Sequence, residues 1–280
     1  PVVGGGADNT CGAVGTGIVR SGRVLASLGT SGVVFAHMDE VHVDPDLRVH
    51  SFCHSIPHKW YLMGVVLFAG GSLQWLRNTV GETEMSAARM MDIDPYELMT
   101  RQASRAPTGS EGLVFLPYLM GERTPHKDAN AKGAFIGLSA RHDRTHLIRS
   151  VMEGITFAMR DSIEIMRGLG LSLSEIRATG GGARSDLWRQ IQADIYGMEV
   201  VTVNAEEGPA FGAAILAAVG TGMFNQVEEA TDEWVKIVSR TEPDAKTSEQ
   251  YDEYYQVFRD LYPVLKPGFD RLSGLVKKHT

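Results

Sequence analysis

The sequence predicts an α/β fold in which a mixed sheet is flanked by helices, and three features support this. Over residues 175–219, strand, glycine turn, helix, strand and helix follow one another. In the first third of the chain, short runs rich in Val, Leu and Phe are typical of β-strands. Over residues 148–166, apolar residues recur at helical spacing and form one long stripe, with charged residues on the other side.

Four short strands and a helix are expected before residue 81. The strands are expected at residues 23–28, 32–36, 49–53 and 60–66. The first two are separated by Gly29-Thr30-Ser31-Gly32, whose glycines are typical of a hairpin turn. Apolar residues at helical spacing predict a helix over 70–80. The polar segment 81–105 is expected to add one or two amphipathic helices, with Pro95 in a first turn.

The rest of the chain continues this alternation. Strands are expected at 113–116, 135–136, 175–178 and 199–203, and helices at 148–166, 185–196 and 209–219. The segment 117–132 is too long and polar for a tight turn, so it is expected to form an ordered functional loop or to face another domain. Glu122 and Arg123 within it form either an ion pair or contacts to a neighbouring domain. A final helix is expected to begin with Thr247 and Gln250 in a capping box.

The composition excludes several classes of protein. Hydrophobic residues make up 43% and charged residues 22% of the chain, as in ordinary soluble globular proteins. The formal net charge of -7, without a cluster of Lys or Arg, argues against nucleic acid or an anionic membrane as the main partner. No apolar run approaches the ~20 residues that span a bilayer.

The cysteines and the first residues bear on location. Cys11 and Cys53 have no paired spacing, which fits a reducing compartment, and no secretory signal pattern opens the chain. We therefore expect a cytoplasmic protein. Because a glycine-rich loop follows Pro1 almost at once, we also expect that the chain begins inside something longer.

The first of three glycine-rich turns carries a carboxylate. Gly4-Gly5-Gly6-Ala7-Asp8 offers a bare backbone that a ligand can approach closely, with Asp8 projecting from it. Such a carboxylate can accept a proton from a substrate hydroxyl during attack. Alternatively, Asp8 caps a helix that begins near Thr10, and spacing alone favours this second interpretation.

Two further turns suit phosphate oxygens. Leu28-Gly29-Thr30-Ser31-Gly32 offers successive backbone N–H groups and two hydroxyls, although taken alone it is more simply a hairpin turn. Thr179-Gly180-Gly181-Gly182-Ala183-Arg184-Ser185 opens a helix, where free N–H donors and the positive end of the helix dipole meet. Neither turn has the spacing of a Walker A loop or a dinucleotide-binding motif. Together, the three turns predict a nucleotide site.

A histidine pattern raises the question of a metal site. His50, His54 and His58 recur every four residues, with Cys53 among them. Pro57 breaks any helix that would place the three imidazoles on one face, and a strand need not bring them together. No metal ligand is therefore assigned.

Longer motifs resemble the FGGY family of carbohydrate kinases. Gly133-Ala-Phe-Ile-Gly-Leu138, followed by His146-Leu147 and Ser150-Val151-Met152-Glu153, is similar to the second signature of that family. Four further segments are similar to the xylulokinase branch of the family. They are His50-Ser-Phe-Cys-His54, Trp60-Tyr-Leu-Met63, Phe115-Leu-Pro-Tyr-Leu119 and Gly121-Glu-Arg-Thr-Pro-His126. The resemblance runs from Val2 to about residue 220.

The resemblance implies a fold, a reaction and roles for particular residues. The family has two ribonuclease H-like, actin-like ATPase domains with the active site between them, and residues 1–280 resemble the second. Asp8 would then be the catalytic base. The nucleotide contacts implied are Gly29 and Thr30 in a phosphate loop, Gly70 and Gln74 in the next turn, and Gly181, Gly182 and Ser185 in the adenosine-binding turn.

The same resemblance implies partners and leaves alternatives. It implies ATP with Mg²⁺, D-xylulose as the sugar that becomes D-xylulose 5-phosphate, and an N-terminal sugar-binding domain absent from these residues. A homodimer is also expected to be possible. Another sugar or polyol kinase of the family, acting on ribulose or glycerol, is one alternative. The other is a non-catalytic actin-like module that binds a nucleotide for regulation or assembly.

Overall fold

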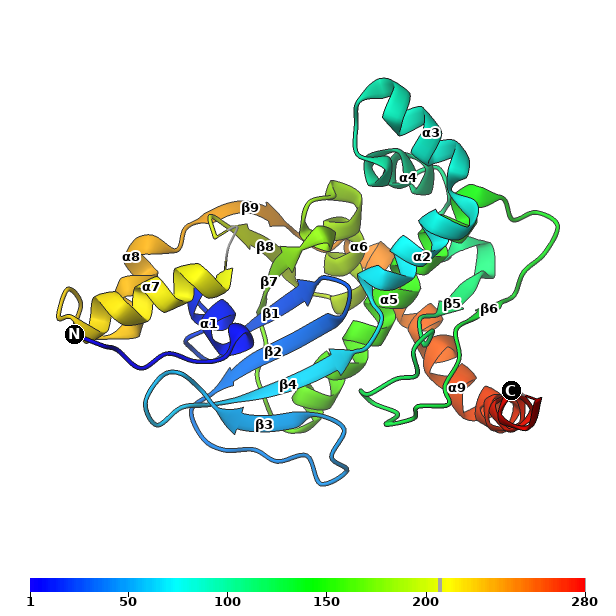
Figure 1. Cartoon of the computed structure of the whole chain (residues 1–280). Helices are drawn as coiled ribbons and strands as arrows, with labels where there is room; N and C mark the ends of the chain where they lie inside the picture. The colour runs from blue at the N-terminus through cyan, green and yellow to red at the C-terminus, as the bar shows by residue number, and fades with distance from the viewer. Residues whose placement is uncertain (206–207, 280) are drawn as a thin grey trace.

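The computed structural model describes residues 1–205 and 208–279, and a seven-stranded mixed sheet forms its centre (Figure 1). The strands lie in the order β3-β4-β2-β1-β7-β8-β9. Their bounds are β1 (Arg23–Leu28), β2 (Gly32–Met38), β3 (His50–Cys53), β4 (Trp60–Val66), β7 (Glu175–Gly180), β8 (Glu199–Val203) and β9 (Ile237–Thr241). β1 pairs antiparallel with β2 and parallel with β7, so the sheet changes direction at its centre. A separate two-stranded sheet joins β5 (Val114–Leu116) to β6 (Ala134–Ile136).

Helices cover both faces of this sheet. The helices are α1 (Asp8–Gly15), α2 (Gly70–Val80), α3 (Glu82–Met91), α4 (Pro95–Ala103), α5 (Arg144–Gly168), α6 (Asp186–Tyr196), α7 (Gly208–Gly220), α8 (Val227–Trp234) and α9 (Ala245–His279), with short 3-10 turns η1 (Thr108–Gly112) and η2 (Gly181–Ala183). α3 and α4 do not cover the sheet but project from the molecule beside α2 (Figure 1). Val24, Ala26 and Leu28 of β1 belong to the core on the α5 side, whereas Leu25 packs on the other side with Ala13 of α1. None of the helices in the described ranges is long and apolar enough to cross a membrane.

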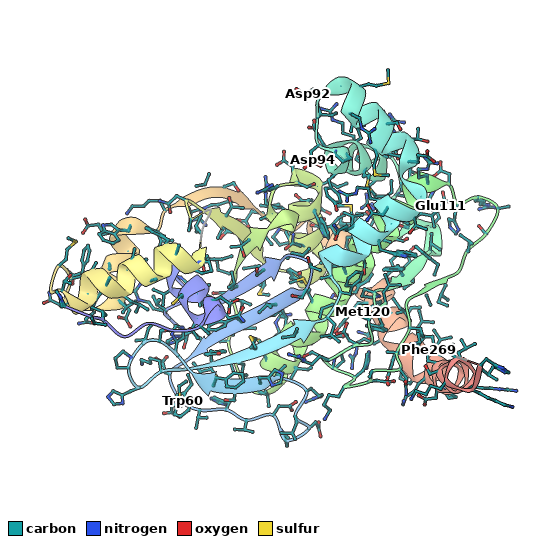
Figure 2. The ribbon with its side chains drawn as sticks, in the orientation of Figure 1. Trp60, Asp92, Asp94, Glu111, Met120 and Phe269 are labelled. Atoms are coloured by element: carbon teal, nitrogen blue, oxygen red, sulfur yellow. The ribbon has the colours of Figure 1, made fainter. Side chains whose placement is uncertain are left out.

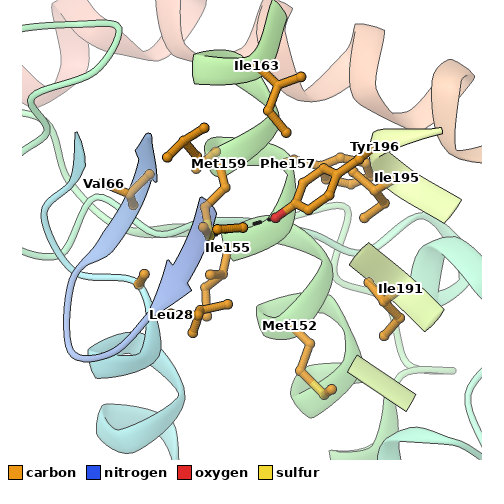
Figure 3. Close-up of a cluster of buried hydrophobic side chains, with 14 of the residues drawn as sticks. Leu28, Val66, Met152, Ile155, Phe157, Met159, Ile163, Ile191, Ile195 and Tyr196 are labelled. Atoms are coloured by element: carbon orange, nitrogen blue, oxygen red, sulfur yellow. Dashed lines mark hydrogen bonds between the residues drawn. The ribbon is translucent and has the colours of Figure 1, made fainter. Parts of the chain in front are cut away.

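The apolar stripe of α5 fills the larger core (Figure 3). Met152, Ile155, Met159 and Ile163 of this stripe are fully or almost fully buried, as are Ile191, Ile195 and Tyr196 of α6. The Tyr196 hydroxyl donates to the Met159 sulfur at 3.8 Å, so its polar atom is not left without a partner. Burying one such aliphatic side chain contributes about 1.5–3 kcal/mol, which makes this stripe the main support of the sheet.

Most of the elements expected from the sequence are confirmed, and two were missed. The strands at 23–28, 60–66 and 199–203 and the helix at 70–80 have the expected bounds. The segment after residue 220 adds α8 and β9, which were not predicted. β9 alternates half-buried and exposed residues at the edge of the sheet, so its apolar signal is weak.

The expected capping box at the start of the last helix is wrong. The helix begins at Ala245, and the preceding Asp244 accepts hydrogen bonds from the backbone N–H and the hydroxyl of Thr247 at 2.8 and 2.7 Å. A carboxylate is a stronger acceptor for these N-terminal donors than a hydroxyl and also meets the positive end of the helix dipole. Thr247 is therefore a donor to the cap rather than the cap itself.

Candidate functional site

A cleft of about 810 Å³ opens where β1 and β7 end, beside the N-termini of α2 and α6. It is lined by Leu28, Gly29, Thr30, Gly70, Leu73, Gln74, Asp94, Tyr96, Glu97, Thr100, Arg101, Ser104, Gly181, Gly182, Arg184, Ser185, Asp186, Leu187 and Trp188. All seven residues predicted to contact a nucleotide are in this set, although they come from three separate parts of the sequence. Its volume lies within the range of small-molecule sites.

Bare backbone forms the floor of the cleft. Gly180 pairs with Leu28 across the parallel strands and has φ +77°, a conformation that L side chains rarely adopt. A Cβ atom at Gly180 would meet the Leu28 backbone, and one at Gly182 would meet the Leu28 side chain. The two strands can therefore end side by side only because these positions carry no side chain.

The N-terminus of α2 holds the hairpin turn in place. The Gly70 N–H donates to the Gly29 carbonyl at 2.9 Å, and the Gly71 N–H donates to the Thr30 carbonyl at 3.0 Å. These bonds turn both carbonyl oxygens toward α2. The Thr30 side chain is exposed at the cleft, and its hydroxyl has no hydrogen bond to any residue within 1–205 or 208–279. The turn thus presents a hydroxyl at the cleft that can donate to a ligand oxygen.

The N-terminus of α6 closes the opposite side. Ser185 is its N-cap, and the Ser185 hydroxyl oxygen accepts a hydrogen bond from the Trp188 N–H at 3.2 Å. The hydroxyl hydrogen stays available to a ligand acceptor. Arg184 lines the cleft beside it and makes no ion pair with the part of the chain that the structure describes. A positive side chain and the positive end of a helix dipole therefore lie at the same edge.

Sequence reasoning missed the wall formed by α4. Tyr96, Thr100 and Ser104 recur at four-residue spacing and all line the cleft. Asp94 caps the helix by accepting a hydrogen bond from the Tyr96 N–H at 2.9 Å. Figure 2 labels Asp94 on the part of the molecule that α3 and α4 form. Polar residues at this spacing are typical of a solvated helix face, so the sequence alone offered little reason to place them in a site.

Asp8 lies outside the cleft. It is the first residue of α1 rather than its N-cap, which is Ala7, so the capping interpretation does not hold. Its exposed carboxylate accepts from the N–H of the next residue at 2.8 Å. The pKa of the Tyr61 hydroxyl is raised by burial, and to a lesser extent by Cys53 and Asp8. Asp8 therefore lies near Tyr61. Tyr61 pairs with β2 five residues from the hairpin turn, so Tyr61 lies roughly 17 Å along the strand from Gly29 and Thr30. Two of the three glycine-rich turns, at 28–32 and 179–185, thus converge on the cleft together with the start of α2, whereas the prediction that the first turn joins them is wrong. The role of Asp8 stays a prediction.

The three histidines of the sequence pattern have separate surroundings. The His54 imidazole is buried, with Nε2 3.1 Å from the Ile18 carbonyl, and burial lowers its pKa to about 4. His50 stacks on Phe52 of the same strand, β3. Within the described residues, no three His, Cys, Asp or Glu side chains are arranged to hold a metal ion.

Glu122 braces the segment that leads into the cleft. It is 2% exposed, and Oε1 accepts from the Leu67 N–H at 2.9 Å and from the Arg123 N–H at 2.7 Å. Glu122 therefore bonds to backbone, and no ion pair with the Arg123 side chain is found in the described part of the chain. Burial is the main cause that raises the pKa of this carboxyl to about 8. At neutral pH it is largely a neutral acid.

Replacing Glu122 by Gln is expected to make stability less dependent on pH. A carboxyl whose pKa is higher in the folded state stabilises the fold fully below its unfolded pKa of about 4.3, and this contribution is lost as pH rises through about 8. The neutral amide keeps the acceptor for Leu67 but cannot ionise. Between pH 5 and 9, thermal unfolding should show a midpoint that falls with pH in the native chain and falls less in Glu122→Gln.

The matched control is Glu233→Gln, which removes an exposed carboxylate from α8. This variant should follow the native pH profile. Identical slopes for native chain and Glu122→Gln would show that Glu122 is already ionised in the fold.

Strand ends and helix N-termini around an open cleft are typical of α/β domains that bind phosphorylated ligands. Residues 24–221 match the FGGY family of carbohydrate kinases, C-terminal domain. The chain therefore belongs to the FGGY family of carbohydrate kinases.

Relatives of known structure and name agree with this assignment. The chain is 40% identical to the xylulose kinase of Bacillus subtilis (strain 168) over 93% of its own length and 50% of that protein. The xylulose kinase structure from Rhodospirillum rubrum superposes with a TM-score of 0.84 at 32% identity, over 95% of this chain and 52% of that one. Gluconate kinase from Lactobacillus acidophilus gives a TM-score of 0.83 at 27% identity, over 94% and 51%. The predicted actin-like, ribonuclease H-like fold is confirmed. The chain spans about half the length of the curated relatives it matches.

Proposed function

We propose that residues 1–280 form the nucleotide-binding, C-terminal domain of a kinase that transfers the γ-phosphoryl group of ATP to D-xylulose, giving D-xylulose 5-phosphate. The observation that carries this proposal is the convergence of Gly29, Thr30, Gly70, Gln74, Gly181, Gly182 and Ser185 on one cleft. The names of the most similar relatives support the sugar, because xylulose kinases recur among them.

The cleft suggests how a nucleotide would lie. The exposed Thr30 hydroxyl offers a donor to phosphate oxygens, whereas the apolar and aromatic groups of Leu73, Leu187 and Trp188 suit a base or ribose. The Ser185 hydroxyl and Arg184 also line the cleft. Phosphoryl transfer needs positioning and charge stabilisation more than covalent chemistry, and rigid turns supply both.

Asp8 is proposed as the base that takes the proton of the attacking sugar hydroxyl. No charged partner pairs with its exposed carboxylate among the residues that the structure describes. Because Asp8 lies outside the cleft, the sugar would have to bind between α1 and the γ-phosphate. We propose that an N-terminal domain of the same protein supplies the remaining contacts to the sugar and excludes water when it closes.

Mg²⁺ is proposed as the companion of ATP. Mg²⁺ usually keeps several waters and binds one or two carboxylates plus substrate phosphates. The cleft fits such weak protein ligation, because three carboxylates line it, of which Asp186 and Glu97 each pair with an arginine and Asp94 caps α4. When bound, the ion would neutralise phosphate charge. We also propose that the protein forms a homodimer. Its two free cysteines are consistent with a proposed location in the cytoplasm.

The test is ADP release by the complete protein with a panel of acceptors. D-xylulose should give the highest kcat/KM among D-xylulose, D-ribulose, D-gluconate and glycerol. A preference for D-gluconate would align the protein with the gluconate kinase that it also resembles. Nucleotide binding without any acceptor-dependent ADP release would indicate a non-catalytic module.

A further inference from the structure

The loop between β5 and β6 completes the outer edge of β4 beyond the end of β3. The last residue of β4 that pairs with β3 is Met63. Because alternate residues of a strand point their N–H groups to the same side, Val65 and Leu67 face the edge that β3 leaves uncovered. The Val65 N–H donates to the Thr124 hydroxyl oxygen at 3.1 Å, and the Leu67 N–H donates to Glu122 Oε1 at 2.9 Å. Side chains of the loop thus take the place of a neighbouring strand.

The loop is itself held in place on two further sides. Thr124 is buried, and its hydroxyl donates to the Arg48 carbonyl, ahead of β3, at 2.9 Å. Glu122 and Asp128 exchange backbone hydrogen bonds at 2.9 and 2.8 Å, which closes the loop. Asp128 Oδ2 accepts a hydrogen bond from the Tyr262 hydroxyl of α9 at 2.7 Å. Because the loop is anchored to α9 as well as to the sheet, it can hold the end of β4 rigidly.

The end of β4 leads directly to the turn between β1 and β2. Leu67 lies three residues before Gly70, the first residue of α2, and three residues span at most about 10 Å. The Gly70 N–H donates to the Gly29 carbonyl at 2.9 Å, and a Cβ atom at Gly70 would overlap the same carbonyl oxygen. Figure 1 shows the chain running from β4 to α2 past this turn. A shift at Leu67 would therefore move the start of α2 and, with it, the turn at Gly29 and Thr30.

We propose that Glu122 is a positioning residue for the phosphate end of the cleft, because it holds Leu67 and thereby fixes the start of α2 and the Gly29-Thr30 turn. This inference rests on the proposed function, since it takes that turn to face the phosphates of ATP. Glu122 Oε2 is buried and has no hydrogen-bond partner in the described ranges, so the brace depends on Oε1 alone. A side chain that only stabilised the fold would affect all ligands of the cleft alike, whereas a brace of the turn affects those that carry phosphates.

Calorimetric titration of the complete protein with ATP and with adenosine, which lacks the phosphates, tests the proposal. Glu122→Ala removes the acceptor of the Leu67 N–H and should raise the dissociation constant of ATP at least about tenfold, because small misplacements of binding groups have large effects. The dissociation constant of adenosine should stay within about threefold, because its contacts lie away from the turn. Glu122→Gln keeps the acceptor oxygen and should bind both ligands within about threefold of the native protein.

A second pair of variants decides the question if circular dichroism shows that Glu122→Ala does not fold. Thr124→Val keeps the shape of the side chain but removes the acceptor of the Val65 N–H, so it should weaken the binding of ATP and not of adenosine, whereas Thr124→Ser should bind as the native protein does. Native affinity for ATP in both Glu122→Ala and Thr124→Val, or equal weakening of ATP and adenosine, would overturn the positioning role and leave the nucleotide site in place. A native protein that does not bind ATP would overturn the proposed function, and this inference with it.

Discussion

Replacing Asp8 by Asn is expected to lower kcat about 10²–10⁴-fold in the complete protein while the affinity for nucleotide stays nearly unchanged. The amide keeps the size and the acceptor oxygen of the carboxylate but cannot take the proton of the sugar hydroxyl, and general-base catalysis typically supplies a rate factor of this size. Nucleotide affinity should persist because Asp8 does not line the cleft. Steady-state ADP release with saturating sugar, together with a titration of ATP binding, measures the two effects separately.

The control for this variant is Asp46→Asn. It neutralises another exposed carboxylate, which does not line the cleft. It should leave kcat within a factor of about two. Turnover by Asp8→Asn at the native rate would remove Asp8 from the mechanism. Loss of ATP binding as well as turnover would mean that α1 supports the cleft rather than the chemistry.

Replacing Gly212 by Ala is expected to destabilise the fold and to lower kcat together. Gly212 of α7 lies so close to α1 that a Cβ atom there would overlap the Cys11 carbonyl and crowd the Gly15 nitrogen. The helices must therefore separate, at a cost of roughly 1–3 kcal/mol for an overpacked contact. Since Asp8 begins α1, the same shift moves the proposed base. Thermal unfolding should show a midpoint lower by several degrees.

A glycine without neighbours provides the comparison. Gly168 ends α5, and a Cβ atom there would meet nothing within 4 Å. Gly168→Ala should leave the unfolding midpoint unchanged or slightly higher, because it restricts the unfolded chain without strain. If Gly212→Ala behaved like Gly168→Ala, the contact between α1 and α7 would not fix the position of Asp8. Lower stability of Gly212→Ala with an unchanged kcat would mean that the contact between α1 and α7 stabilises the fold but does not position the proposed base.

Periodicity was sufficient where one face of an element is buried. The helix at 70–80 and the strand at 60–66 have the expected bounds because their apolar residues follow the period of the element. The helix at 148–166 is longer in the structure, beginning at Arg144 behind an Asp143 cap, because its ends are polar and carry no periodic signal. β9 was missed because half-buried and exposed residues alternate along it, which leaves a weak apolar signal. α8 was missed although Val227, Ala230 and Thr231 recur at helical spacing and are buried.

The sequence by itself determined the glycine turns and the hydroxyls within them, because backbone freedom and hydrogen-bonding capacity belong to single residues and survive in any fold. Only the tertiary structure decided that β1 and β7 end side by side, that α4 forms a wall of the cleft, and that Asp8 lies outside it. Those relations depend on pairing between distant segments, and no local pattern encodes the distance between residues that the sheet brings together.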